Sequence, residues 1–172
     1  MMLATLAGGC FWCTEAVFKR LKGVSTVTPG YSGGKMDDPD YDSVSMGTTG
    51  HAEAIQLEFD PTIISFDTLL DVFFATHDPT TVNAQGNDVG TQYRSVIFYH
   101  DEDQKKIAES KMKPGYVTQI VPFEKFFSAE TYHKDYYDKN HDSNPYCSVV
   151  IDPKVKKLLQ KFSSEVKDEY KQ

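Results

Sequence analysis

Apolar residues along the chain fall into two kinds of segment, which predict strands and helices. The strand-like segments are short and apolar, or alternate apolar with polar positions; they are residues 3–7, 24–31, 52–59, 94–100, 117–121 and 147–151. The helix-like segments repeat apolar positions every three to four residues; they are residues 14–22, 66–76, 101–111 and 152–166. The order begins strand-helix-strand-strand-helix-strand-helix-strand, which indicates an α+β fold with helices packed on a mixed or antiparallel sheet.

Polar residues mark where two of the predicted helices begin. Ser65 precedes the second helix and can accept a hydrogen bond from its first turn. Asp152 and Pro153 open the last helix, with the aspartate as cap and the proline in the first turn. These signals fix the helix starts more firmly than the helix ends.

Three segments between the predicted elements carry no clear period. Residues 35–50 are polar and rich in turn formers, and residues 78–93 read as a long loop. Long ordered loops are often functional. Residues 122–146 are aromatic-rich but irregular, and we expect them to wrap the domain rather than form a core of their own.

Composition narrows the class of protein. The chain has 172 residues, 40% of them hydrophobic, and no linker, so we expect one globular domain over residues 1–172. The net charge of −7 disfavours nucleic acid and anionic membrane as partners. No apolar run approaches the roughly 20 residues of a membrane-spanning helix, and the N-terminus lacks the basic region of a signal peptide. A cytoplasmic monomer is the plain expectation.

The cysteines point to redox or metal chemistry rather than to a disulfide framework. There are three, and Cys10 and Cys13 form a C-x-x-C pair while Cys147 stands alone. A zinc site would need two further ligands, yet the sequence has no second C-x-x-C and no paired histidine spacing. We therefore expect no metal. Two of the histidines, His51 and His133, could support a site through hydrogen bonds.

Cys10 is the clearest nucleophile. Gly8 and Gly9 allow a tight turn before it, and the predicted helix begins just after it, where the helix dipole favours a thiolate. The alternative is a buried cysteine that acts as a small hydrophobic residue. Phe11 and Trp12 follow directly and would suit a pocket for a small apolar group, unless one of them packs into the core.

Four polar residues could complete a site. Glu53 interrupts an apolar strand, and a carboxyl in apolar surroundings has a raised pKa and can donate a proton near neutral pH. Alternatively, Glu53 faces solvent from an alternating strand. Tyr31 and Tyr93 lie at the ends of predicted elements, where a phenol can donate a hydrogen bond, and Asp88 would otherwise be a turn residue.

Four segments, taken in order, resemble the A-type peptide methionine sulfoxide reductases. They are Gly9-Cys10-Phe11-Trp12, Gly30-Tyr31-Ser32-Gly33-Gly34, Gly50-His51-Ala52-Glu53-Ala54 and residues 85–95. The resemblance covers residues 3–150, nearly the whole chain. It implies a two-layer α/β sandwich around a ferredoxin-like core.

The resemblance also implies an activity, the reduction of the S epimer of methionine sulfoxide, free or in proteins, as a repair of oxidised proteins. Cys10 would attack the sulfoxide sulfur while a neutral Glu53 protonates the oxygen. Tyr31 and Tyr93 would hydrogen-bond that oxygen. Asp88 would order a backbone group or water near the site.

In the same reading, Phe11 and Trp12 enclose the methyl group of the substrate. Methionine leaves and Cys10 becomes a sulfenic acid. A second thiol condenses with it, and thioredoxin or a small dithiol reduces the resulting disulfide. The reaction needs no metal or organic cofactor.

The resolving thiol stays open. The family pattern has glycine where this chain has Cys13, which is close to Cys10 in sequence. Cys147 matches roughly the first of the cysteines that many members carry in a glycine-rich tail, although residues 148–151 are strand-like here. Cys147 is slightly favoured, because a segment arriving from outside can reach the sulfenic acid without distorting the helix start. A relay through both is a further alternative.

Two other functions fit the cysteines alone. A general disulfide oxidoreductase would use Cys10 and Cys13 equally and would reduce protein disulfides. A thiol or zinc-binding module would carry stoichiometric metal after purification.

Overall fold

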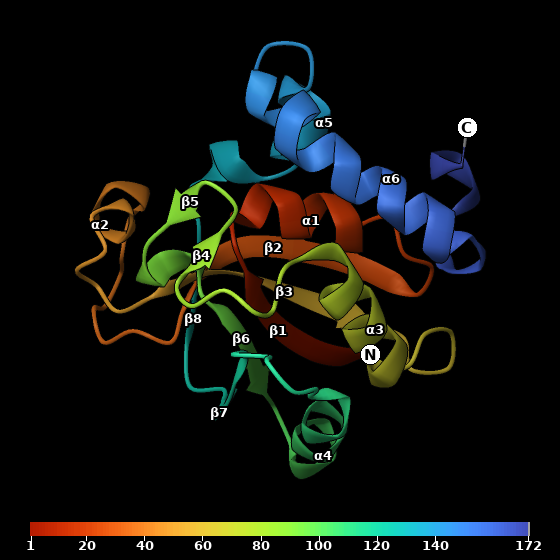
Figure 1. The fold of residues 1–172 in the computed structure, drawn as a ribbon, viewed down its shortest axis with the longest axis horizontal. Helices are drawn as coiled ribbons and strands as arrows, with labels where there is room; N and C mark the ends of the chain where they lie inside the picture. Colours follow the sequence, from red (N-terminus) through yellow and green to blue (C-terminus); the bar gives the residue numbers. More distant parts are fainter. Residues whose placement is uncertain (172) are drawn as a thin grey trace.

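The strand segments pair into one curled sheet in the computed structural model, which describes residues 1–171 (Figure 1). Gln172, the last position of the expected domain 1–172, lies outside the described residues. The sheet has six strands in the order β7-β6-β1-β3-β2-β8. In chain order these are β1 (Met2–Gly8), β2 (Val24–Ser32), β3 (Ala52–Phe59), β6 (Ser95–Tyr99), β7 (Gln119–Pro122) and β8 (Phe126–Ser128).

All neighbouring strands run antiparallel except β6 and β7, which are parallel. The prediction of a mixed sheet with helices packed on it is therefore confirmed. A separate two-stranded hairpin, β4 (Ala84–Gln85) with β5 (Asp88–Val89), lies inside the segment that was expected to be a loop.

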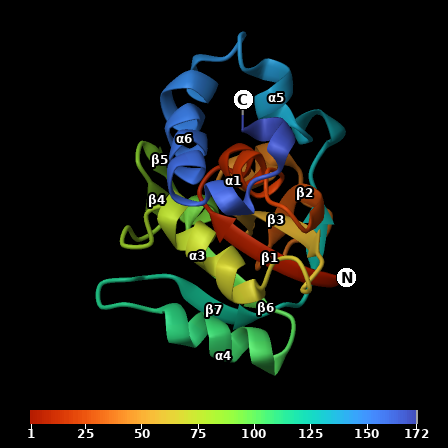
Figure 2. The same ribbon diagram turned by 90° about the vertical axis from the view of Figure 1, so that its right-hand side faces the viewer.

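Six α-helices pack around the sheet in the described chain, residues 1–171. They are α1 (Phe11–Phe18), α2 (Tyr41–Ser45), α3 (Phe66–Thr76), α4 (Glu102–Lys111), α5 (Tyr136–Asn140) and α6 (Asp152–Lys161). Figure 2 shows α5 and α6 at the end of the molecule opposite α4 and β7. Within the described chain, no helix is long and apolar enough to cross a membrane.

The alternation of side chains along the strands explains why α1 and α3 cover the same face. Leu6 of β1 pairs with Ile55 of β3, and both side chains enter the larger buried cluster. Phe18 of α1 and Leu70 of α3 belong to the same cluster. Because successive strand residues point to opposite faces, Ala7 enters a smaller cluster behind the sheet. The core thus lies between the sheet and the two helices that follow β1 and β3.

The predicted strand at 147–151 is wrong, because these residues form a π-helical turn, Cys147–Ile151, that runs directly into α6. Cys147 and Ile151 are buried while Val149 is 72% exposed, which is a helical spacing and not an alternation. Apolar runs of this length are ambiguous between helix and strand in sequence alone.

The last helix differs from the prediction at both ends. Ile151 takes the N-cap position because the π-helical turn already precedes it, so Asp152 is not the cap. The Asp152 carboxylate instead accepts hydrogen bonds from Tyr137 and His141. The helix ends at Lys161 rather than at 166, whereas Pro153 is in the first turn as predicted.

The segment 122–146 lies along the outside of α1. It contains β8, a 3-10 turn at Thr131–His133 and α5, and α5 contacts α1. Lys19 of α1 pairs with Asp135 and Asp138 at 2.8 and 2.5 Å, which ties the segment to the helix. Lys19 is the C-cap residue of α1, so these ion pairs hold the segment at the end of the helix, and Trp12 and Cys13 contact it at the start.

Candidate active site

Cys10 lies where β1 ends and α1 begins. It is the N-cap residue of α1, with extended backbone angles, and its side chain is partly exposed. Gly9 has a φ of +91°, and a Cβ at this position would lie 2.7 Å from Gln85 Cγ. Only glycine satisfies both the backbone angle and the space. The prediction that Cys10 sits at the helix start is confirmed.

The Cys10 and Cys13 thiols face each other across the first turn of α1. The Cys13 amide donates to the Cys10 carbonyl at 3.0 Å, which closes that turn. The hydrogen bond from Cys10 lowers the pKa of Cys13 to about 7. Burial, and then the hydrogen bond to Cys13, raise the pKa of Cys10. These shifts favour the thiolate on Cys13 and the proton on Cys10, the reverse of the expectation from the helix start. Transfer of that proton to Cys13 makes Cys10 the thiolate.

Glu53 lies beside Cys10 in the middle of the sheet. Its side chain is 1% exposed, which excludes the solvent-facing alternative. Oε1 accepts a hydrogen bond from the Phe11 amide at 3.2 Å, and Oε2 is buried without a partner in the described chain. Burial raises the pKa of Glu53 to about 8. At neutral pH the carboxyl is therefore mostly protonated, with one oxygen free to face a substrate.

Tyr31 is fully buried, and its hydroxyl is already engaged. It donates to Glu130 Oε1 at 2.9 Å. Glu130 Oε2 accepts the amide of Tyr41 at 2.9 Å, so this carboxylate holds β2 and α2 together. Sequence patterns gave no sign of Glu130. The Tyr31 hydroxyl therefore donates to Glu130, whereas the sequence predicted that it donates to the substrate oxygen.

Tyr41, which sequence analysis missed, lies close to Glu53 and Cys10 together with Tyr93. Burial, and then proximity to the charges of Glu53 and Cys10, raise the pKa of Tyr41 to about 12. The same three causes raise the pKa of Tyr93. Two phenols therefore remain as neutral donors near the carboxyl and the thiol. One signal was available, since Asp40 forms a capping box with Ser43 that starts a helix at Tyr41.

Of the two aromatic residues after Cys10, Phe11 lies in the core and Trp12 is partly exposed. Phe11 is fully buried, with its ring centroid 4.9 Å from that of His133. Trp12 is partly buried; its Nε1 donates to His133 Nδ1 at 3.0 Å, and its ring stacks on Tyr136 at 3.7 Å and 6°. His133 thus supports the site through a hydrogen bond, as one reading of the sequence expected. The indole plane is fixed by contacts on its edge and on one face.

Asp88 is linked to Cys13 through the hydroxyl group of Tyr146. The Tyr146 hydroxyl donates to Asp88 Oδ2 at 2.6 Å and lies 3.7 Å from Cys13 Sγ. Cys147 follows Tyr146 in sequence, is fully buried, and shares an apolar cluster with Cys13. The structure therefore brings all three cysteines into one region, with Cys13 between the other two.

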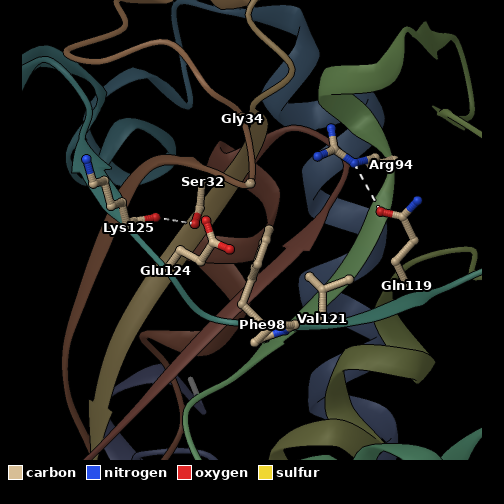
Figure 3. A pocket seen from close by; sticks show the side chains of 10 residues that line it. Ser32, Gly34, Arg94, Phe98, Gln119, Val121, Glu124 and Lys125 are labelled. Carbon is tan, nitrogen blue, oxygen red and sulfur yellow. Dashed lines mark hydrogen bonds between the residues drawn. The ribbon is translucent and has the colours of Figure 1, made fainter.

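Of two hollows in the described chain, one lies beside the cysteines and the other does not. A groove of about 810 Å³ opens beside Cys10 and Cys13. A smaller cavity of about 220 Å³ lies elsewhere, between Arg94, Phe98 and Lys125, and includes neither thiol nor Glu53 (Figure 3). Among residues 1–171, no cluster of three or more histidine, cysteine or acidic side chains is arranged to hold a metal ion.

Comparisons with known proteins agree with this chemistry. A family model described as peptide methionine sulfoxide reductase matches residues 2–167. The chain is 59% identical to the peptide methionine sulfoxide reductase MsrA of Sulfolobus acidocaldarius, over 94% of this chain and 96% of that protein. For the MsrA of Saccharolobus solfataricus the identity is 57%, over 97% of this chain and 98% of that one.

Solved structures give the same picture. Reduced Mxr1 from Saccharomyces cerevisiae superposes with a TM-score of 0.77 at 39% identity, covering 83% of this chain and 87% of that one. Mxr1 in complex with Trx2 superposes with a TM-score of 0.53 at 28% identity, covering 78% of this chain and 84% of that one.

Proposed function

The chain belongs to the peptide methionine sulfoxide reductase family, and from that premise we propose that it reduces the S epimer of methionine sulfoxide, free or in proteins, with Cys10 as nucleophile. Membership makes it an oxidoreductase that acts on methionine sulfoxide. The observation that carries the finer proposal is the buried Glu53 carboxyl, which is neutral at pH 7 and keeps one oxygen unpartnered beside Cys10.

The first half-reaction transfers the oxygen from substrate to enzyme. A sulfoxide sulfur is weakly electrophilic until its oxygen is protonated, and Glu53 Oε2 supplies that proton. The Cys10 thiolate attacks the sulfur, methionine leaves, and Cys10 becomes a sulfenic acid. Glu53 ends this step as a carboxylate and regains its proton from water.

Tyr41 and Tyr93 stabilise the developing charge on the oxygen in this mechanism. Both lie near Glu53 and Cys10, and burial keeps both protonated. Tyr31, the residue that the family resemblance indicated, holds Glu130 and so positions α2, from which Tyr41 projects. We therefore assign the second phenol donor to Tyr41 and a positioning role to Tyr31.

Replacing Tyr41 with phenylalanine should lower kcat/KM for methionine sulfoxide by about 10²-fold, since one preorganised donor to a developing oxyanion is removed. The matched control is Tyr31→Phe, which removes the hydroxyl that holds Glu130. Steady-state rates with dithiothreitol measure both variants. Equal losses in kcat for the two variants, with unchanged folding by circular dichroism, would refute the division of roles.

Trp12 provides the wall for the substrate methyl group. Its contacts with His133 and Tyr136 hold the indole in one plane, so the wall is set before substrate arrives. Phe11 lies beneath in the core and supports that wall from the inside. A fixed chiral arrangement of this wall and the Glu53 proton is what selects one sulfoxide epimer.

We assign the resolving step to Cys13. Its thiolate is available at neutral pH, and its hydrogen bond with Cys10 places it next to the sulfur that carries the hydroxyl. Cys13 gives up its proton and attacks Cys10 Sγ, the S–O bond breaks, and the hydroxide leaves with that proton as water, so the Cys10–Cys13 disulfide forms. Cys147 lies against Cys13 and not beside the open groove, so this burial supports Cys13 over the position-based preference for Cys147.

One experiment tests the reaction and the resolving thiol together. Reduced protein is mixed separately with methionine S-sulfoxide and R-sulfoxide, without reductant, and then alkylated and digested. We expect methionine only from the S epimer and a Cys10–Cys13 peptide disulfide by mass spectrometry. No methionine from either epimer refutes the proposed function, and a Cys10–Cys147 disulfide refutes the assignment of Cys13.

The proposal also covers the fold class, the domain bounds, the compartment and the reductant. The strand order β6-β1-β3-β2, with α1 and α3 on one face, supports the two-layer sandwich with a ferredoxin-like core. We propose one catalytic domain over residues 1–172, working as a cytoplasmic monomer without metal or organic cofactor. Thioredoxin or another dithiol is the reductant, in line with the Mxr1 structure in complex with Trx2.

A further inference from the structure

The groove beside Cys10 and Cys13 is a separate surface from the cluster of acid–base groups around Glu53, as its lining shows. Its walls come from the segment after α3, the β4–β5 hairpin and the turn that leads into α6. Among the described residues that line it, none is Glu53, Tyr41 or Tyr93. The acidic side chains that line the groove are Asp78 and Asp88, so a sulfoxide oxygen would not meet the proton donor Glu53 there.

A disulfide between Cys10 and Cys13 would nevertheless be reachable through the groove, because both cysteines line it. A thiolate that reduces a disulfide must contact one sulfur directly while the other leaves. Cys10 is the more accessible of the two, since Cys13 is 2% exposed. The groove thus gives a route to Cys10 for an incoming thiol.

The rim of the groove combines apolar surface with two cations. Val149 is 72% exposed on this rim. Lys154 and Lys157 are three residues apart on α6, so both side chains lie on one face of the helix. Within the described chain neither amine has an ion-pair partner, in contrast to Lys19 and Lys111. The lining also holds two aspartates, but Asp78 accepts hydrogen bonds from Thr80 and Asp88 accepts one from Tyr146. The two amines are therefore the charged groups of the lining that have no partner in the described chain.

We infer that this groove is the docking surface for the reductant, a small protein whose exposed dithiol is surrounded by apolar surface and flanked by acidic side chains that meet Lys154 and Lys157. The inference rests on the proposed function, because it requires the Cys10–Cys13 disulfide to form. Charge complementarity at the rim speeds encounter and orients the partner, while the apolar surface around Val149 supplies the contact.

The exchange balances in two steps. A thiolate of the partner attacks Cys10 Sγ, the Cys10–Cys13 bond breaks, and Cys13 leaves as a thiolate. The partner's second thiolate then attacks the partner sulfur of the mixed disulfide and releases Cys10. Two electrons pass to the enzyme, the partner leaves as a disulfide, and its two protons reach the enzyme thiols.

The test compares two double variants of α6. Lys154→Glu with Lys157→Glu reverses both groove charges, whereas Lys156→Glu with Lys161→Glu makes the same charge change on the same helix outside the groove lining. Each protein is assayed at saturating methionine sulfoxide with thioredoxin, kept reduced by its reductase and NADPH, and separately with dithiothreitol. The readout is the ratio of kcat/KM for thioredoxin to kcat/KM for dithiothreitol, so a change in the chemistry itself cancels.

The groove variant should lose about tenfold in this ratio at low salt, and the control should stay within about twofold of wild type. The wild-type ratio should also fall as salt is raised, whereas that of the groove variant should not. Equal ratios for the two double variants would overturn the inference, as would a loss expressed in KM for an oxidised peptide instead. If wild type makes no methionine with dithiothreitol, the proposed function itself has failed, which is a different result.

Discussion

Replacing Cys10 with serine should remove methionine formation altogether, a loss of about 10⁴-fold or more in kcat, in line with the loss of the nucleophile in other enzymes. A serine hydroxyl at the same N-cap position keeps the helix start but is not ionised near neutral pH. It also cannot accept the sulfoxide oxygen as a sulfenic acid. Methionine released in a single turnover, measured by chromatography, gives the result directly.

The other two cysteines provide the controls. Cys13→Ser and Cys147→Ser should each release methionine in the first turnover, because the nucleophile remains. With a thioredoxin system, Cys13→Ser should then slow, since its sulfenic acid has lost the adjacent thiol. A general disulfide oxidoreductase would instead lose activity equally on changing Cys10 or Cys13, and that outcome would contradict the sulfenic acid mechanism.

Glu53→Gln should lower kcat/KM by about 10²- to 10⁴-fold, the range that a positioned general acid contributes. The amide keeps the shape and can accept the Phe11 hydrogen bond, but it cannot transfer a proton. Wild-type activity should fall as pH rises through about 8, where Glu53 loses its proton, and rise with pH near 7, where the thiol pair ionises. The descending limb should be absent from the residual activity of the variant.

Stability gives an independent check on the same residue. Burial raises the folded-state pKa of Glu53 from 4.5 to about 8, so between these values the folded protein binds a proton that the unfolded chain lacks. The free energy of unfolding of the wild type should therefore fall across this interval relative to Glu53→Gln, and the difference should be constant above it. A difference that does not change with pH in urea unfolding would show that Glu53 has an ordinary pKa.

Local sequence signals were sufficient to place Cys10 at the start of a helix but not to place the groups around it. Two glycines before a helix signal predict the turn because the positive φ of Gly9 is a local requirement, whereas the lack of space there comes from Gln85, far along the chain. Glu53 could be proposed but its burial could not, since an alternating strand leaves either face possible until the helices are placed. The Glu53 side chain points inward because its face of the strand is the one that the helices cover.

The roles of Tyr31 and Tyr41 could not be predicted from the sequence. Tyr31 and Tyr41 both precede or follow turn-rich segments, and nothing local tells which hydroxyl is free. The answer depends on Glu130, which is 99 residues from Tyr31 in sequence and accepts a hydrogen bond from its hydroxyl. In the same way, the strand expected at 147–151 is a helical turn because α6 continues it and Cys13 packs against it.

The contacts that bind the start of α1 to residues near 130–146 have a consequence during synthesis. Trp12 depends on His133, which follows it by 121 residues, and Cys13 meets Tyr146, which follows it by 133. A ribosome has therefore made most of the polypeptide before the thiol pair has its surroundings, and pairings this distant close slowly. The nascent chain carries Cys10 without these neighbours, and reductase activity begins only after residues 133–146 have packed against α1.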